Sequence, residues 1–109
     1  MISDAEIDKA VNWLRDNAPE AAQAKANRVY LDEYRKTLKA ELMAQVNDKA
    51  LGAQEVYAYA HPRYAAHLDA MKEAVRIDAE FGFLREAAQA KIEAWRTQSS
   101  NLRAEGKAT

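Results

Sequence analysis

The chain has 109 residues, the length of one small domain, and its 16 basic and 17 acidic side chains give a formal net charge of −1. It contains no cysteine, which excludes disulfides, thiolate nucleophiles and cysteine-based metal sites. Alanine contributes 24 of its hydrophobic residues and glycine and proline are rare, so the composition favours an all-α fold without a deep, enzyme-like core.

The first predicted element is a short helix over residues 4–16. Ser3 with Glu6 three residues later forms a capping box, the pattern that opens many helices. Apolar residues then recur with the helical period as far as Leu14. We expect this helix to stop at Asn17-Ala18-Pro19, because proline disfavours the helical conformation of the residue before it.

The second predicted element is a long amphipathic helix over residues 19–47. Leu31, Leu38 and Leu42 recur at helical spacing and form one apolar face. The polar run that ends at Gly52 predicts a turn, and a short helix follows over residues 53–60.

His61-Pro62 separates that short helix from the last predicted helix, which covers residues 62–104. Its apolar stripe changes phase between Ile77 and Gly82. Gly82 lies inside the pattern, where glycine costs about 1 kcal/mol relative to alanine. The sequence therefore leaves two alternatives open, a continuous helix and a helix broken at Gly82.

These elements predict a single domain, 1–109, in which two long helices form a hairpin and a short N-terminal helix packs across it. Such a hairpin buries only a narrow seam, in which we place Trp95. The seam cannot cover all of the large aromatic side chains, which are Trp13, Tyr30, Tyr57, Tyr59, Tyr64, Phe81, Phe83 and Trp95. Self-association into a dimer or a higher oligomer would cover them.

No residue set predicts catalysis or a cofactor. His61 and His67 are six residues apart and point in different directions on a helix, so we interpret both as structural, His61 as a cap of the following helix. The carboxylates are scattered, and no phosphate-binding glycine loop, nucleophile elbow or zinc motif occurs. We therefore expect a protein that is not an enzyme and binds neither a metal nor a cofactor.

Basic side chains gather in two segments, residues 25–39 with a net charge of +3 and residues 85–109 with a net charge of +2. The spacing of the bases in each segment predicts a stripe along one helix. If the helices are antiparallel, the two stripes would line one surface that tracks the backbone of single-stranded DNA. The predicted nucleic-acid-binding residues are Lys25, Arg28, Tyr30, Arg35, Lys39, Arg85, Arg96 and Arg103. The alternative interpretation is that these bases only solvate the outer faces of long helices.

Three segments carry a resemblance to known proteins: residues 27–31 (Asn-Arg-Val-Tyr-Leu), residues 57–62 (Tyr-Ala-Tyr-Ala-His-Pro) and residues 91–103, which include Glu93-Ala94-Trp95-Arg96. Together they resemble small helical proteins of tailed bacteriophages and prophages. The resemblance implies a place among early phage genes, often with DNA recombination and replication functions. In architecture the chain is also similar to the recombination-mediator proteins of T-even-like phages, which are helical oligomers that bind single-stranded DNA.

The sequence thus predicts a non-enzymatic phage accessory protein of DNA recombination or replication, located in the host cytoplasm and not in a membrane. As an oligomer it would bind single-stranded DNA, a recombination protein of phage or host, or both. The alternative is a protein-binding adaptor or inhibitor of a host enzyme or defence system without nucleic-acid contact. Tyr57, Tyr59 and Phe83 on one apolar patch would favour a protein partner. Tyr30 and Tyr34 flanked by Arg28 and Arg35 would favour nucleic acid.

Overall fold

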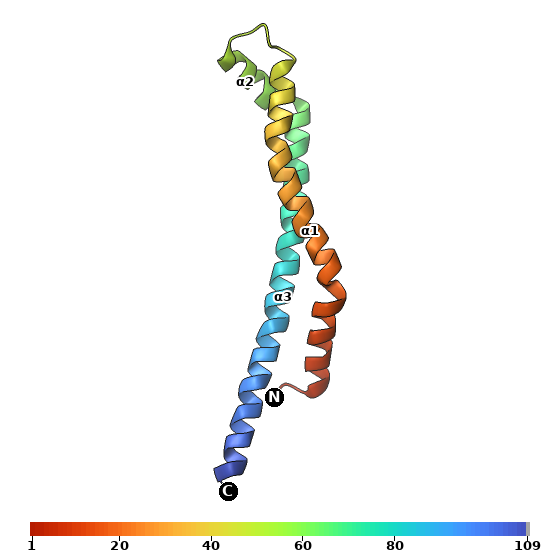
Figure 1. The fold of residues 1–109 in the computed structure, drawn as a ribbon, viewed down its shortest axis with the longest axis vertical. Coiled ribbons are helices and arrows are strands. Elements are labelled where there is room, and N and C mark those ends of the chain that lie inside the picture. The colour runs from red at the N-terminus through yellow and green to blue at the C-terminus, as the bar shows by residue number, and fades with distance from the viewer. Residues whose placement is uncertain (109) are drawn as a thin grey trace. The chain divides into compact units, whose positions relative to one another are not determined.

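The computed structural model describes residues 1–108 and consists of three α-helices with no strand in that range. They are α1 (Asp4–Ala44), α2 (Leu51–Ala60) and α3 (Pro62–Ala108) (Figure 1). Asp4 of α1 contacts Trp95 of α3, and Arg28 further along α1 contacts Asp78 earlier in α3, as in an antiparallel hairpin. The predicted all-α class and the helical hairpin are confirmed.

The N-terminus of α1 is capped as the sequence predicts. The Glu6 backbone N–H donates to Ser3 Oγ at 3.2 Å, so one of the orphan donors of the first turn is satisfied.

The predicted break after residue 16 is wrong, because α1 continues through Pro19 to Ala44. The separate short helix 4–16 and its packing across the hairpin are therefore absent. Proline in a helix interior removes one hydrogen bond and costs about 3 kcal/mol. Packing outweighs this local cost, since Ala10 before the proline and Ala24 after it are both buried.

The two junctions around α2 differ from the prediction by a few residues. α1 ends at Ala44 instead of residue 47, and α2 begins at Leu51 instead of residue 53. Gln54 Nε2 donates to the Lys49 carbonyl at 2.7 Å and ties the turn to α2. The predicted cap on the next helix is confirmed, because His61 Nδ1 accepts a hydrogen bond from the Arg63 backbone N–H at 3.0 Å.

α3 runs through Gly82 without interruption, which decides between the two alternatives that the sequence leaves open. Gly82 does not have a positive φ, so its backbone suits any L-residue. A Cβ at this position would meet only the end of the Arg85 side chain, at an ordinary contact distance of 3.8 Å. Glycine therefore has no geometric role at this point of the helix.

We expect Gly82→Ala to raise the free energy of unfolding by about 1 kcal/mol, the difference in helix propensity between the two residues. Urea denaturation followed by circular dichroism measures this change. Gly106→Ala, close to the end of α3, is the matched control and should change stability less. A Gly82→Ala protein less stable than the wild type would contradict a continuous helix.

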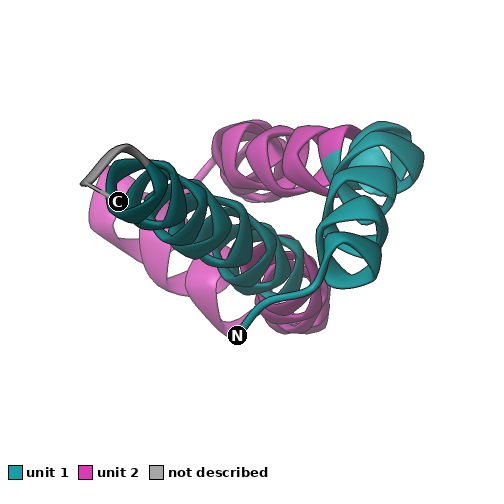
Figure 2. Cartoon of the chain, turned by 90° about the horizontal axis from the view of Figure 1, so that it is seen from below, with its two compact units in different colours: residues 1–21, 80–109 teal, residues 22–79 magenta. Residues whose placement is uncertain are grey.

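The chain divides into two compact units (Figure 2). Unit 1 comprises residues 1–21 and 80–109, and unit 2 comprises residues 22–79. The single domain 1–109 of the sequence analysis thus consists of two parts. The division in α3, between Ala79 and Glu80, lies where the apolar stripe changes phase.

Unit 2 holds the larger core. Leu38, Leu42 and Ala58 form a buried cluster, and Leu42 has no exposed surface. The side chains packed around this cluster are Tyr34, Met43, Tyr57 and Tyr64. Since these residues come from all three helices, the cluster fixes α2 against α1 and α3 within this unit.

Candidate binding surfaces

The basic stripe of α1 lies in unit 2, and most of its cations are engaged by carboxylates. Arg28 Nε donates to Asp78 Oδ2, and this half-buried ion pair joins α1 to α3. Arg35 lies 3.9 Å from the carboxylate of Asp32 within α1. An incoming phosphate would have to compete with these carboxylates for the same donors.

Lys39 is held at the contact between α1 and α2. Its Nζ is 3.8 Å from Glu55 Oε1 and 4.8 Å from the centre of the Tyr59 ring, a cation–π arrangement. The Tyr59 side chain is the main cause of a raised pKa at Lys39, to which the charge of Glu55 adds. Lys25 is exposed and, among the residues that the structure describes, forms no ion pair.

Tyr30 does not lie beside the basic stripe. Successive residues of an α-helix are rotated by about 100°, so positions 28 and 30 point in nearly opposite directions. Arg28 meets Asp78, whereas Tyr30 lines a groove together with Glu73. Arg28 and Tyr30 therefore lie on different sides of α1.

The rings of Tyr30, Tyr34 and His67 contact one another in succession, from the surface to the interior of unit 2. Its ring, in a residue that is 66% exposed, stacks on Tyr34 with centroids 6.0 Å apart. Tyr34 in turn contacts the ring of His67 at 5.6 Å. His67 is buried, and its Nε2 lies 2.7 Å from the Leu31 carbonyl oxygen, which gives it the structural role that the sequence predicts.

The second predicted group of cations, Arg85, Arg96 and Arg103, belongs to unit 1. Arg96 pairs with Glu93 one turn earlier, at 3.6 Å. The two predicted stripes thus belong to different units, and no single unit contains both. The expected common surface of α1 and α3 cations stays a prediction.

Large apolar side chains remain exposed in both units. They are Met1, Val11, Val29, Tyr30, Leu51, Val56, Tyr59, Leu68, Val75, Phe83, Leu84 and Leu102. Three of them belong to α2, a ten-residue helix whose only charged residue is Glu55. Tyr59 and Phe83, which the protein-partner hypothesis places together, belong to different units.

Each unit also has a groove between α1 and α3, a feature that sequence periodicity did not predict. The groove of unit 2 has a volume of about 450 Å³ and is lined by Ala24, Asn27, Tyr30, Leu31, Ala70, Glu73, Ala74 and Ile77. Arg76 donates to both carboxylate oxygens of Glu73 and lowers the pKa of that carboxyl group. The acidic edge of this groove is therefore already paired.

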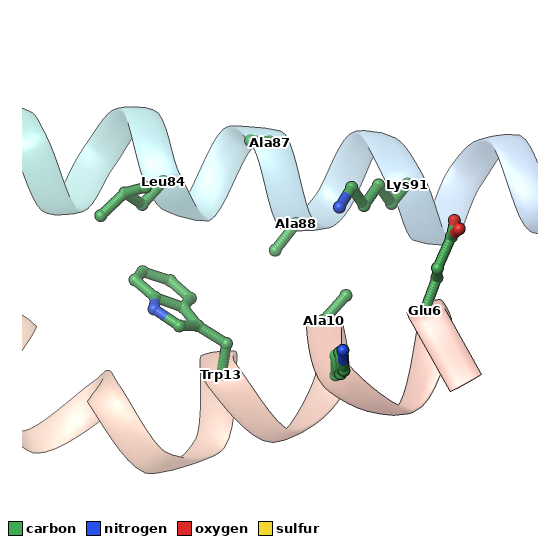
Figure 3. Close-up of a pocket in the computed structure, with 8 residues that line it drawn as sticks. Glu6, Ala10, Trp13, Leu84, Ala87, Ala88 and Lys91 are labelled. Carbon is green, nitrogen blue, oxygen red and sulfur yellow. The ribbon is translucent and has the colours of Figure 1, made fainter. Parts of the chain in front are cut away.

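The groove of unit 1 has a volume of about 460 Å³ and is lined by Glu6, Lys9, Ala10, Trp13, Leu84, Ala87, Ala88 and Lys91 (Figure 3). Trp95 lies in the same unit, where its Nε1 donates to Asp4 Oδ1 at 3.2 Å. This contact between α1 and α3 agrees with the predicted place of Trp95 in the seam.

Within residues 1–108, no group of three or more His, Asp or Glu side chains is arranged to hold a metal ion. In the same part of the chain, no helix is both long and apolar enough to cross a membrane. Comparison with known proteins finds no matching family model, curated protein or solved structure.

Proposed function

We propose that this chain is a non-enzymatic interaction protein that acts as an oligomer and binds a protein partner. The observation that carries the proposal is the imbalance between core and surface. Only three large apolar side chains among the described residues are buried, Ile7, Leu38 and Leu42, while twelve large hydrophobic residues are exposed. Three of the exposed residues, Leu51, Val56 and Tyr59, share the ten-residue helix α2, and exposed apolar residues gathered in this way are typical of protein–protein interfaces.

The outer surface of α2 is where the partner binds in this proposal. Leu51, Val56 and Tyr59 are each more than half exposed, and Tyr59 is anchored by Lys39 and by an edge-on contact with Tyr64. A preorganised tyrosine among aliphatic neighbours is a common hot spot, because little side-chain entropy is lost when it is covered.

The biological setting that we propose is phage DNA recombination or replication. Its support is the resemblance of residues 27–31, 57–62 and 91–103 to small phage proteins. In this setting the partner is a recombination or replication protein of phage or host. The alternative partner, a host enzyme or defence component, would use the same apolar surface.

Single-stranded DNA is the second ligand that we consider, and the basic segment 25–39 is the observation that favours it. Lys25, Arg28, Arg35 and Lys39 follow one side of α1, but three of these four cations are paired with carboxylates. DNA binding in this proposal is therefore weak and strongly salt-dependent, with about 0.7 log unit lost per phosphate contact for each tenfold rise in salt.

Sedimentation equilibrium at micromolar concentrations tests the oligomer. A monomer at every concentration up to about 100 µM, a range typical of weak but specific association, would overturn the proposed function. Capture of a partner by the wild type but not by a Val56→Asp, Tyr59→Ala variant tests the α2 surface. Both side chains are exposed, so the fold should survive.

Fluorescence polarisation with labelled oligo-dT at ~50 mM and ~200 mM salt tests the second ligand. We expect Lys25→Gln with Arg35→Gln to reduce the salt dependence by up to about two phosphate contacts. Lys72→Gln, an exposed lysine of α3 outside the stripe, is the matched control. Absence of any oligonucleotide binding at the lower salt concentration would remove DNA from the proposal.

A further inference from the structure

The boundary between the two units crosses both long helices. α1 passes from unit 1 into unit 2 between Ala21 and Ala22, and α3 passes back into unit 1 between Ala79 and Glu80 (Figure 2). Both helices are continuous at these points, so the units are joined by two helical connections. The stiffness of these two connections therefore decides whether the units move as one body.

Neither connection is held by a fully packed core. Residues 11–23 of α1 and residues 75–87 of α3, all of which the structure describes, are at most partly buried. The nearest buried residues on either side are alanines, Ala10 and Ala24 in α1 and Ala74 and Ala88 in α3. Since most of the stability of a helix in a protein comes from packing, both helices are least supported where they cross the boundary.

Pro19 weakens the connection through α1. Proline has no backbone N–H, so the Arg15 carbonyl does not receive the helical hydrogen bond that residue 19 would otherwise donate. Two residues before the proline, the Asn17 side-chain amide donates to the Trp13 carbonyl at 3.0 Å. A proline and a side chain bonded to the backbone carbonyls are both known causes of helix bending.

Gly82 weakens the connection through α3 at the same level of unit 1. Antiparallel helices that meet at Asp4 and Trp95 bring Pro19 to the level of residue 80, two residues from Gly82. Neither a positive φ nor a close approach of another segment requires glycine at this position. The conformational freedom that glycine gives the backbone remains as the physical reason for its presence.

We propose that Pro19 and Gly82 form a hinge about which unit 1 and unit 2 change their mutual orientation. Four features coincide there: the boundary between the units, the absence of buried residues, a proline in one helix and a glycine in the other. Hinges are formed by a few residues that absorb the change in backbone angles while the units on either side stay intact.

Each unit keeps its own contact between α1 and α3. Asp4 contacts Trp95 in unit 1, and Arg28 pairs with Asp78 in unit 2. Bending at the hinge therefore breaks neither of these contacts. The hinge is a property of the chain itself and does not depend on the proposed partner.

Residual dipolar couplings of the backbone N–H groups, measured by NMR on the ¹⁵N-labelled protein, test the hinge. Hinge motions between folded units take microseconds to milliseconds, and these couplings average over that range. We expect the couplings of each unit to fit an alignment tensor of its own, with different magnitudes for the two units. A single tensor that fits both units of the wild type would overturn the proposal.

The double variant Pro19→Ala, Gly82→Ala restores the missing N–H and removes the glycine, so one tensor should then fit both units. Pro19 is exposed and a Cβ at position 82 has room, so both helices should form. The matched control is Gly52→Ala with Gly106→Ala, which replaces glycines away from the boundary and should leave the two tensors distinct. Two distinct tensors in the Pro19→Ala, Gly82→Ala protein would show that these residues do not form the hinge.

Amide hydrogen exchange is a second, independent measurement of the hinge in α3. In the wild type, the backbone amides of residues 84–86 should exchange faster than those of residues 68–74, because the helix opens locally at Gly82. Gly82→Ala alone should slow exchange at residues 84–86 about fivefold, the difference in helix propensity expressed as an equilibrium constant. Equal protection of the two segments in the wild type would overturn the hinge.

Discussion

Replacing Leu42 by alanine is expected to lower the free energy of unfolding by about 2 to 5 kcal/mol. Leu42 is the one large side chain among the described residues with no exposed surface, and it lies against Leu38 and Ala58. Removing three buried carbon atoms loses their transfer free energy and leaves a cavity that three converging helices cannot fully close. Urea denaturation monitored by circular dichroism measures the loss.

Leu102→Ala is the matched control for this substitution. The same atoms are removed from α3 at a position that is 50% exposed, so the loss should stay below about 1 kcal/mol. Equal effects of Leu42→Ala and Leu102→Ala would show that the cluster around Leu42 is not the centre of the core.

Enlarging Ala58 to leucine is expected to destabilise the protein by about 1 to 3 kcal/mol. Ala58 is fully buried and is the residue through which α2 reaches Leu38 and Leu42. Because Ala58 has no exposed surface, we expect the three added carbon atoms to push α2 outward and to weaken the contact between Lys39 and Tyr59. Thermal unfolding measures the stability, and the NMR shifts of Tyr59 report on α2.

Ala53→Leu places the same side chain on the exposed side of α2 and serves as the control. Its effect should stay within about 0.5 kcal/mol, as for most surface substitutions. A fully tolerated Ala58→Leu would mean that α2 does not pack against the other helices through this residue.

Helix content could be predicted from the sequence because it depends on local chemistry. The Ser3 cap, the periodic leucines of α1 and the break at His61-Pro62 each act over a few residues. The break expected at Pro19 failed for the opposite reason. Its local cost is outweighed by contacts that α1 makes with a segment fifty residues away.

The candidate site was predicted only in part. The positions of the cations followed from the sequence, but their partners did not, since Asp78 and Glu55 approach Arg28 and Lys39 through tertiary packing. The helical period alone separates Tyr30 from the basic stripe, because positions 28 and 30 are rotated by about 200° around the helix axis.

By itself the sequence determined the all-helical class, the caps at Ser3 and His61, the absence of cysteine chemistry and the phase change near Gly82. Tertiary structure alone decided that α1 continues through Pro19, that Arg28 and Lys39 pair with carboxylates of other helices and that each unit has a groove between α1 and α3. The physical reason is the distance along the chain over which each effect acts. Capping and helical periodicity act between residues a turn or two apart, whereas ion pairs and grooves depend on which distant segments the apolar faces bring together.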